Sequence, residues 1–246
     1  MSQLLSSKIP IVLIIFPLLF ILTKSQLSLQ DKNVIENFIF QSQSKNTGLF
    51  FEEQDPYKHT KEAISVLDIL GLQVKHSKEI CKNLSEAGKI DVNIVSIDKQ
   101  LKCKMDFKSY KPDFSKQKLV DLYHEAQIMD MLNLDGWKDL FKKIKNFMVQ
   151  ENGKFSLTKL SEGKKRSIIG TALGIEIMVL IAQKEKELKS EIEPLLQKSV
   201  DSLFKSNAVL SDDMIVYLEK GVGSYRLNYH VIKAIKSAKK VGIDIP

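Results

Sequence analysis

Residues 1–25 constrain the rest of the chain most, because they decide where it folds. Residues 1–8 are polar with one cation, Lys8, and an uncharged apolar run follows over 9–22. Thr23 and Ser25 place small residues at the two positions that a signal peptidase reads. The run is shorter than the ~20 apolar residues that a membrane-spanning helix needs. We therefore expect a signal peptide, cleaved after about Ser25, and delivery to the lumen of the endoplasmic reticulum, with an uncleaved anchor or a buried helix as the alternative.

The remaining residues are enough for a packed core without metals. The chain has 246 residues, of which 43% are hydrophobic and 27% charged, as in ordinary globular proteins. This length allows one domain or two small ones, and we treat 26–246 as one helical lumenal domain. The net charge of +7 comes from lysine, since Arg166 and Arg226 are the only arginines. Nucleic-acid recognition relies strongly on arginine, so we expect no nucleic-acid partner.

Helical periodicity dominates the chain, with apolar residues spaced three and four apart. Segment 168–182 is apolar nearly all round and is predicted to be the central helix of the core. Segment 89–118 is less regular: apolar residues alternate weakly over 92–97, and 111–113 is predicted to be a turn or loop. The other predicted helices cover 34–39, 58–70 with a stop at Gly71, 77–84 capped by Ser77, 115–132, 137–149, a helix to about 204 with Pro194 in its first turn, and 225–241 ended by Gly242.

These segments predict a mainly all-α fold. The stretch 63–72 can be laid over 234–243, which indicates repeated helical hairpins stacked as an α/α toroid or a solenoid. A short β-hairpin is also expected, in which 155–157 pairs with 214–218.

The expected compartment bears on the redox state of the two cysteines, Cys81 and Cys103. In an oxidising lumen a lone pair most simply forms one disulfide; two buried free thiols are the alternative. A zinc site would need more ligands than this pair offers. One N-glycosylation sequon, Asn83-Leu84-Ser85, makes Asn83 a candidate glycosylation site.

The search for catalytic motifs assigns no residue. His59, His76, His124 and His230 include no pair spaced for a metal on one helix face, and neither a nucleophile elbow nor a phosphate loop is present. Segment 138–145 is a basic amphipathic helix that suits anionic lipid or a partner helix, and we favour the simpler interpretation of a solvated face. We assign no catalytic, cofactor-binding or metal-binding residue and expect no cofactor.

Several segments together resemble ribophorin II, a subunit of the oligosaccharyltransferase complex. Segment 34–84 resembles its N-terminal lumenal region: a helix that ends in a leucine–glycine stop precedes a helix with a lysine and then a cysteine. Cys81 and Cys103 match the two cysteines of that region. Segment 153–243 looks like the later part of the same region. The middle, 104–150, matches only in being helical.

The resemblance implies a non-catalytic subunit of the enzyme that transfers a glycan to asparagine. Its expected partners are other oligosaccharyltransferase subunits and nascent glycoprotein chains. Family members continue into β-rich domains and a membrane-spanning tail that this chain lacks, so it resembles a shortened, truncated or split member. Membrane contact is then expected only through partners or such a tail. The alternatives are an α/α-toroid enzyme of the prenyltransferase kind and a secreted helical binding protein unrelated to glycosylation.

Overall fold

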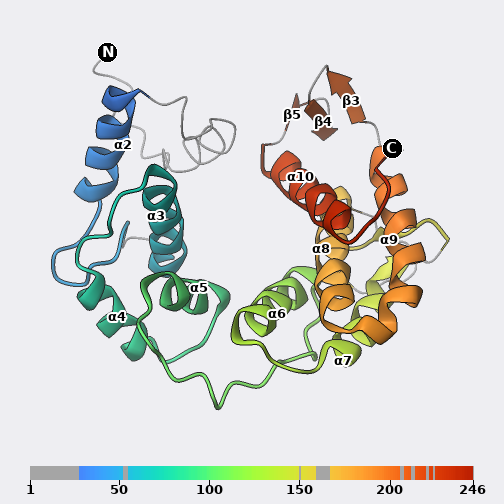
Figure 1. The fold of residues 1–246 in the computed structure, drawn as a ribbon, viewed down its shortest axis with the longest axis horizontal. Helices are drawn as coiled ribbons and strands as arrows, with labels where there is room; N and C mark the ends of the chain where they lie inside the picture. Colours follow the sequence, from blue (N-terminus) through green and yellow to red (C-terminus); the bar gives the residue numbers. More distant parts are fainter. Residues whose placement is uncertain are drawn as a thin grey trace. The chain divides into compact units, whose positions relative to one another are not determined.

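The computed structural model describes residues 28–51, 55–149, 151–158, 167–205, 208–211, 214–219, 222–223 and 225–245. The predicted signal peptide, 1–25, lies outside these residues. The chain divides into two compact units, Met1–Asp106 and Phe107–Pro246, called here the first and the second unit. Both are mainly helical (Figure 1). The prediction of a mainly α fold with a small β-hairpin is confirmed.

The first unit contains four described helices, each beginning and ending at a recognisable signal. They are α2 (Leu29–Gln41), α3 (Pro56–Leu70), α4 (Ser77–Glu86) and α5 (Val92–Leu101). The side chain of Ser28 accepts a hydrogen bond from the Asp31 backbone at the start of α2, and Pro56 occupies the first turn of α3. Gly71 ends α3 in the left-handed conformation, with φ 74°, as the sequence predicted.

Two local features of this unit differ from what the sequence indicated. Ser77 is the first residue of α4, and His76 holds the cap position in the left-handed region with φ 51°. Helix α5 lies where no strong helix was predicted. Asp91 starts it by accepting hydrogen bonds from the backbone of Asn93 and Ile94. Its valines and isoleucines lower helix propensity, and burial of that apolar face against α3 compensates.

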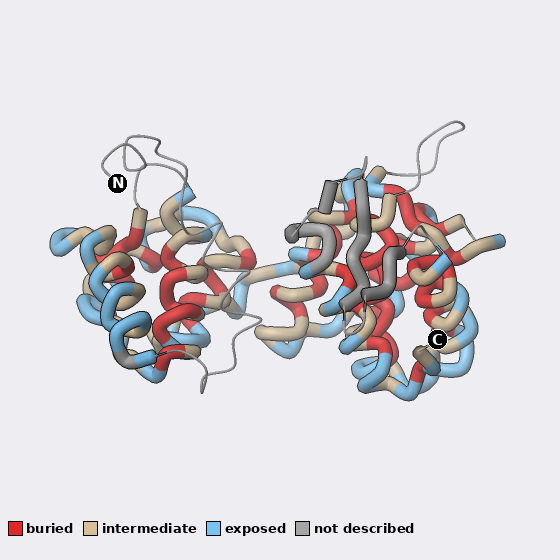
Figure 2. The backbone as a smooth tube through the Cα atoms, turned by 90° about the horizontal axis from the view of Figure 1, so that it is seen from above, coloured by how far each residue is buried: buried red, intermediate tan, exposed pale blue. Residues whose placement is uncertain are grey.

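The second unit is built around α8 (Ile168–Lys184), which is buried on nearly every side as the sequence predicted. The helices that surround it are α6 (Leu119–Leu132), α7 (Trp137–Ile144), α9 (Lys189–Phe204) and α10 (Tyr225–Lys240). Short 3-10 turns, Lys145–Phe147 and Lys186–Leu188, join neighbouring elements. In Figure 2 the buried stretches of backbone (red) lie toward the inside of each unit, and exposed stretches (pale blue) lie along its outer turns.

Close backbone packing holds α8 in place. A Cβ on Gly174 would lie 2.5 Å from the ring of the buried Phe155, so only glycine allows this approach. Phe155 belongs to β2 (Lys154–Phe155), which pairs antiparallel with β1 (Met148–Val149). The strand packs on α8, and the backbone N–H of Phe155 donates to Thr171 Oγ1 at 3.1 Å.

The strand pairing differs from the prediction. Segment 214–218 does not pair with 155–157: β4 (Met214–Glu219) lies between β3 (Ala208–Ser211) and β5 (Val222–Gly223), antiparallel to both. Each strand pairs with a near neighbour along the chain, because closing a short connection costs little chain entropy.

Helix bounds also differ in the second unit. Pro194 lies inside α9, which begins at Lys189, and not in its first turn. Helix α6 begins at Leu119, after a loop, and α7 ends at Ile144, where the chain tightens before β1. Among the residues that the structure describes, no helix is long and apolar enough to cross a membrane.

Candidate functional site

The predicted site residues of the sequence all lie in the first unit, around α4 and α5. Cys81 on α4 and Cys103 just after α5 form a disulfide, with 5.2 Å between their Cα atoms. Lys102 adopts the left-handed conformation with φ 58° and turns the chain out of α5. The Cys103 N–H donates to the Asp98 carbonyl, and buried Asp98 accepts from the Met105 N–H at 2.9 Å. These contacts hold Cys103 facing α4.

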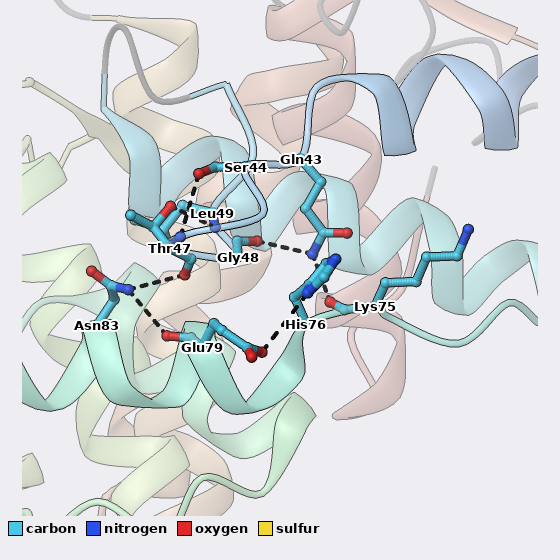
Figure 3. A network of polar contacts seen from close by, with 9 residues as sticks. All are labelled: Gln43, Ser44, Thr47, Gly48, Leu49, Lys75, His76, Glu79 and Asn83. Atoms are coloured by element: carbon cyan, nitrogen blue, oxygen red, sulfur yellow. Dashed lines mark hydrogen bonds and ion pairs between the residues drawn. The ribbon is translucent and has the colours of Figure 1, made fainter.

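The third predicted residue, Asn83, joins α4 to the loop 42–51 (Figure 3). Its Nδ2 donates to the Thr47 carbonyl at 3.0 Å and to the Glu79 carbonyl, one turn earlier in α4, at 3.1 Å. The side chain is half-buried, and the Tyr57 hydroxyl donates to its backbone carbonyl at 3.4 Å. Asn83 is therefore a link between two segments that are distant in sequence.

The side-chain amide of Gln43, near the start of the same loop, also anchors it. Gln43 Nε2 donates to the Gly48 carbonyl at 2.9 Å and to the Lys75 carbonyl at 2.6 Å (Figure 3). Gly48 has φ +73°, and a Cβ there would lie 2.7 Å from the His76 carbonyl oxygen. The loop is thus pressed closely against the start of α4, and it buries Leu49 and Phe50 in the core.

The second unit contains an ionic cluster around a buried carboxylate, which the sequence analysis did not find. Glu176 on α8 is only 4% exposed, and its Oε2 accepts from Lys233 Nζ of α10 at 2.7 Å and from the Tyr123 hydroxyl of α6 at 2.8 Å. Lys233 Nζ also donates to the Tyr123 oxygen, as does Gln127 Nε2 at 3.1 Å. One carboxylate therefore connects three helices.

The two oxygens of Glu176 have unequal surroundings. Its Oε1 is buried without a hydrogen-bond partner in the described structure, and so is His230 Nδ1, which lies 3.9 Å away on α10. Burial and the adjacent Glu176 carboxylate raise the pKa of the Tyr123 phenol above its ordinary value. The phenol therefore stays protonated and donates to Glu176.

The chemistry of this cluster is that of a hydrogen-bonded ion pair. Lys233 neutralises the carboxylate, and Tyr123 supplies a second donor, the combination that a buried charge requires. Among the described residues no three His, Cys, Asp or Glu side chains are placed to hold a metal ion together. One sequence signal pointed to the cluster: Glu176 is the single charged residue within 168–182. A charge on an otherwise apolar helix needs a partner.

Comparisons of the chain with models of known protein families, with curated proteins and with solved structures gave no match.

Proposed function

We propose that the protein is a non-catalytic, helical protein of the endoplasmic-reticulum lumen, of the ribophorin II kind. It supports N-glycosylation by contact with other oligosaccharyltransferase subunits and with nascent glycoprotein chains. Residues 1–25 direct it there and are removed after about Ser25. The cysteines and the helical pattern that carry the resemblance lie within 31–103 and 153–243.

The disulfide between Cys81 and Cys103 is the observation that carries this proposal. Structural disulfides persist in oxidising compartments and are rare in the cytosol. Such a bond, together with an N-terminal secretory pattern, supports the proposed lumenal location. The ribophorin II resemblance adds two cysteines at these same positions in the chain.

The use of polar side chains supports a role in binding over one in catalysis. Glu176, the most buried charge of the described second unit, is neutralised by Lys233 and bonded to Tyr123. In the first unit, Asn83 and Gln43 give their amide hydrogens to backbone carbonyls. These groups stabilise helix packing and loop geometry, and a rigid helical surface is what a contact subunit offers.

Affinity purification of the full chain tests the proposal. A tag after Pro246 is used to recover the protein from detergent-solubilised membranes of its own cells, and mass spectrometry identifies what accompanies it. We expect oligosaccharyltransferase subunits in near-stoichiometric amounts and a mature N-terminus near residue 26. A variant lacking 1–25 is the matched control, and it should stay in the cytosol without these subunits.

Two other results would replace the proposal. Recovery from the culture medium without glycosylation subunits would identify a secreted binding protein. Stoichiometric zinc in the purified protein, measured by elemental analysis, would favour a toroid enzyme.

A further inference from the structure

The Asn83 amide has a fixed orientation and no spare hydrogen. Both groups that face its Nδ2, the carbonyls of Thr47 and Glu79, are acceptors, so the NH₂ group and not the oxygen must point at them. Each hydrogen is given to one carbonyl, at 3.0 and 3.1 Å. The pairing with Thr47 connects residues 36 positions apart, and it anchors the loop 42–51 on α4.

This same nitrogen is the atom to which a glycan would be attached. The attached carbon would lie about 1.45 Å from Nδ2, the length of a C–N single bond. Along either N–H direction it would overlap sterically with a carbonyl oxygen that lies only 3.0 or 3.1 Å from Nδ2, so the glycan and the native contacts cannot coexist. The rest of the sequon is fixed as well, because Leu84 is buried and Ser85 Oγ donates to the Lys82 carbonyl at 2.6 Å.

We propose that Asn83 is a structural clamp, and that its glycosylation and the native loop 42–51 exclude each other. The folded protein carries a bare amide at its single sequon. A chain that receives a glycan at Asn83 before folding loses the anchor between the loop and α4. This inference rests on the proposed lumenal location only in so far as glycan transfer occurs there, whereas the clamp itself does not depend on it.

The first test compares two ways of destroying the sequon. Asn83→Ala removes the sequon and the clamp, whereas Ser85→Ala removes the sequon and leaves the clamp. With purified, disulfide-bonded full chain, we expect Asn83→Ala to lower the melting midpoint of the first unit by about 5 °C, from the loss of the two hydrogen bonds that the Asn83 amide donates. Ser85→Ala should match the parent protein. Equal midpoints for Asn83→Ala and the parent would overturn the clamp.

A milder variant keeps this test usable if Asn83→Ala does not fold. Asn83→Ser retains one donor at the position, so its melting midpoint should lie between that of Asn83→Ala and that of the parent. Amide hydrogen exchange then reads the loop directly. The N–H groups of Gly48 and Phe51, which donate to Ser44 and Ser42 carbonyls, should exchange faster in the variant. Unchanged exchange there would contradict the proposal.

The second test follows the glycan itself in the full chain passed through a secretory pathway. Asp135→Thr creates a reporter sequon in which the exposed Asn133 is the acceptor, at the turn that follows α6. We expect the folded, disulfide-bonded fraction to carry a glycan at Asn133 and none at Asn83, as shown by intact mass before and after endoglycosidase. A species glycosylated at Asn83 that melts like the bare protein would overturn the exclusion. A bare Asn133 would instead refute lumenal entry, and the stability comparison would then decide the clamp alone.

Discussion

The two units bury their cores by different means. In the first unit the loop 42–51 carries two buried core residues, Leu49 and Phe50, and it is held by Gln43 and Asn83. A disulfide in the same unit joins α4 to the segment that follows α5. In the second unit an apolar helix, α8, is surrounded by other helices and carries one buried carboxylate, Glu176.

This contrast illustrates how the size of the core changes which interactions stabilise a unit. A small unit buries a smaller fraction of its surface, and cross-links and specific hydrogen bonds then supply a larger share of its stability. In the second unit the central helix is buried all round and supplies enough apolar contact to carry a charge, Glu176, in its middle. Such a buried charge destabilises the fold strongly if its partners are removed.

Removing Lys233 should produce the largest effect. Lys233→Met leaves the buried Glu176 carboxylate without its cation, and we expect the free energy of unfolding of the second unit to fall by about 4 kcal/mol. Trp137, the only tryptophan, is buried in the same core. Its fluorescence during denaturant unfolding therefore follows this unit.

The double variant Lys233→Met/Glu176→Leu is the control for charge. It removes the unpaired carboxylate together with the lysine and should recover more than half of the lost free energy. A double variant as unstable as Lys233→Met would show that lost packing, and not the unpaired charge, is responsible.

Removing the disulfide should have the next largest effect, confined to the first unit. Replacing Cys81 and Cys103 by serine opens a loop with a sequence separation of 22. We expect a loss of about 3 kcal/mol from the greater chain entropy of the unfolded state. Hydrogen exchange of α4 and α5 should accelerate while the Trp137 transition stays where it was. If both units lose stability equally, they unfold as one cooperative body and the contrast between them fails.

Alkaline pH should produce the smallest effect. The pKa of Tyr123 is raised in the folded state by burial and by Glu176. The stability that this phenol contributes is therefore fully present below the unfolded pKa of about 10 and is lost as the pH rises above it. Between pH 10 and 11 we expect Tyr123 to account for about 1 kcal/mol of lost stability.

Tyr123→Phe isolates this contribution, because phenylalanine cannot ionise. Trp137 fluorescence should show a flatter decline of stability for the variant between about pH 10 and 11. Parallel declines for the variant and the parent would mean that other groups control alkaline unfolding.

Features with a local cause were predictable from the sequence. The end of α3 at Gly71 needs only a residue that tolerates a left-handed conformation, and α8 needs only a long apolar run with a single charge in it. Helix α5 was missed because its isoleucines and valines disfavour helix locally, and packing against α3 and α4 offsets that preference. The predicted strand pairing was wrong for the same reason, since pairing depends on which segments meet in the folded chain.

The candidate site also combines features that the sequence predicted with features that only the structure shows. Cys81 and Cys103 were paired from the sequence because two cysteines in the expected oxidising compartment leave one choice of bridge, and Asn83 was noticed because a sequon is a local pattern. The sequence alone determined the helical character of the chain, the buried helix α8 and these candidate residues. Only the tertiary structure decided that Glu176 meets Tyr123, and that the Asn83 amide is committed to Thr47. These two contacts join residues 53 and 36 positions apart, and no local propensity encodes which distant partners will meet when the core closes.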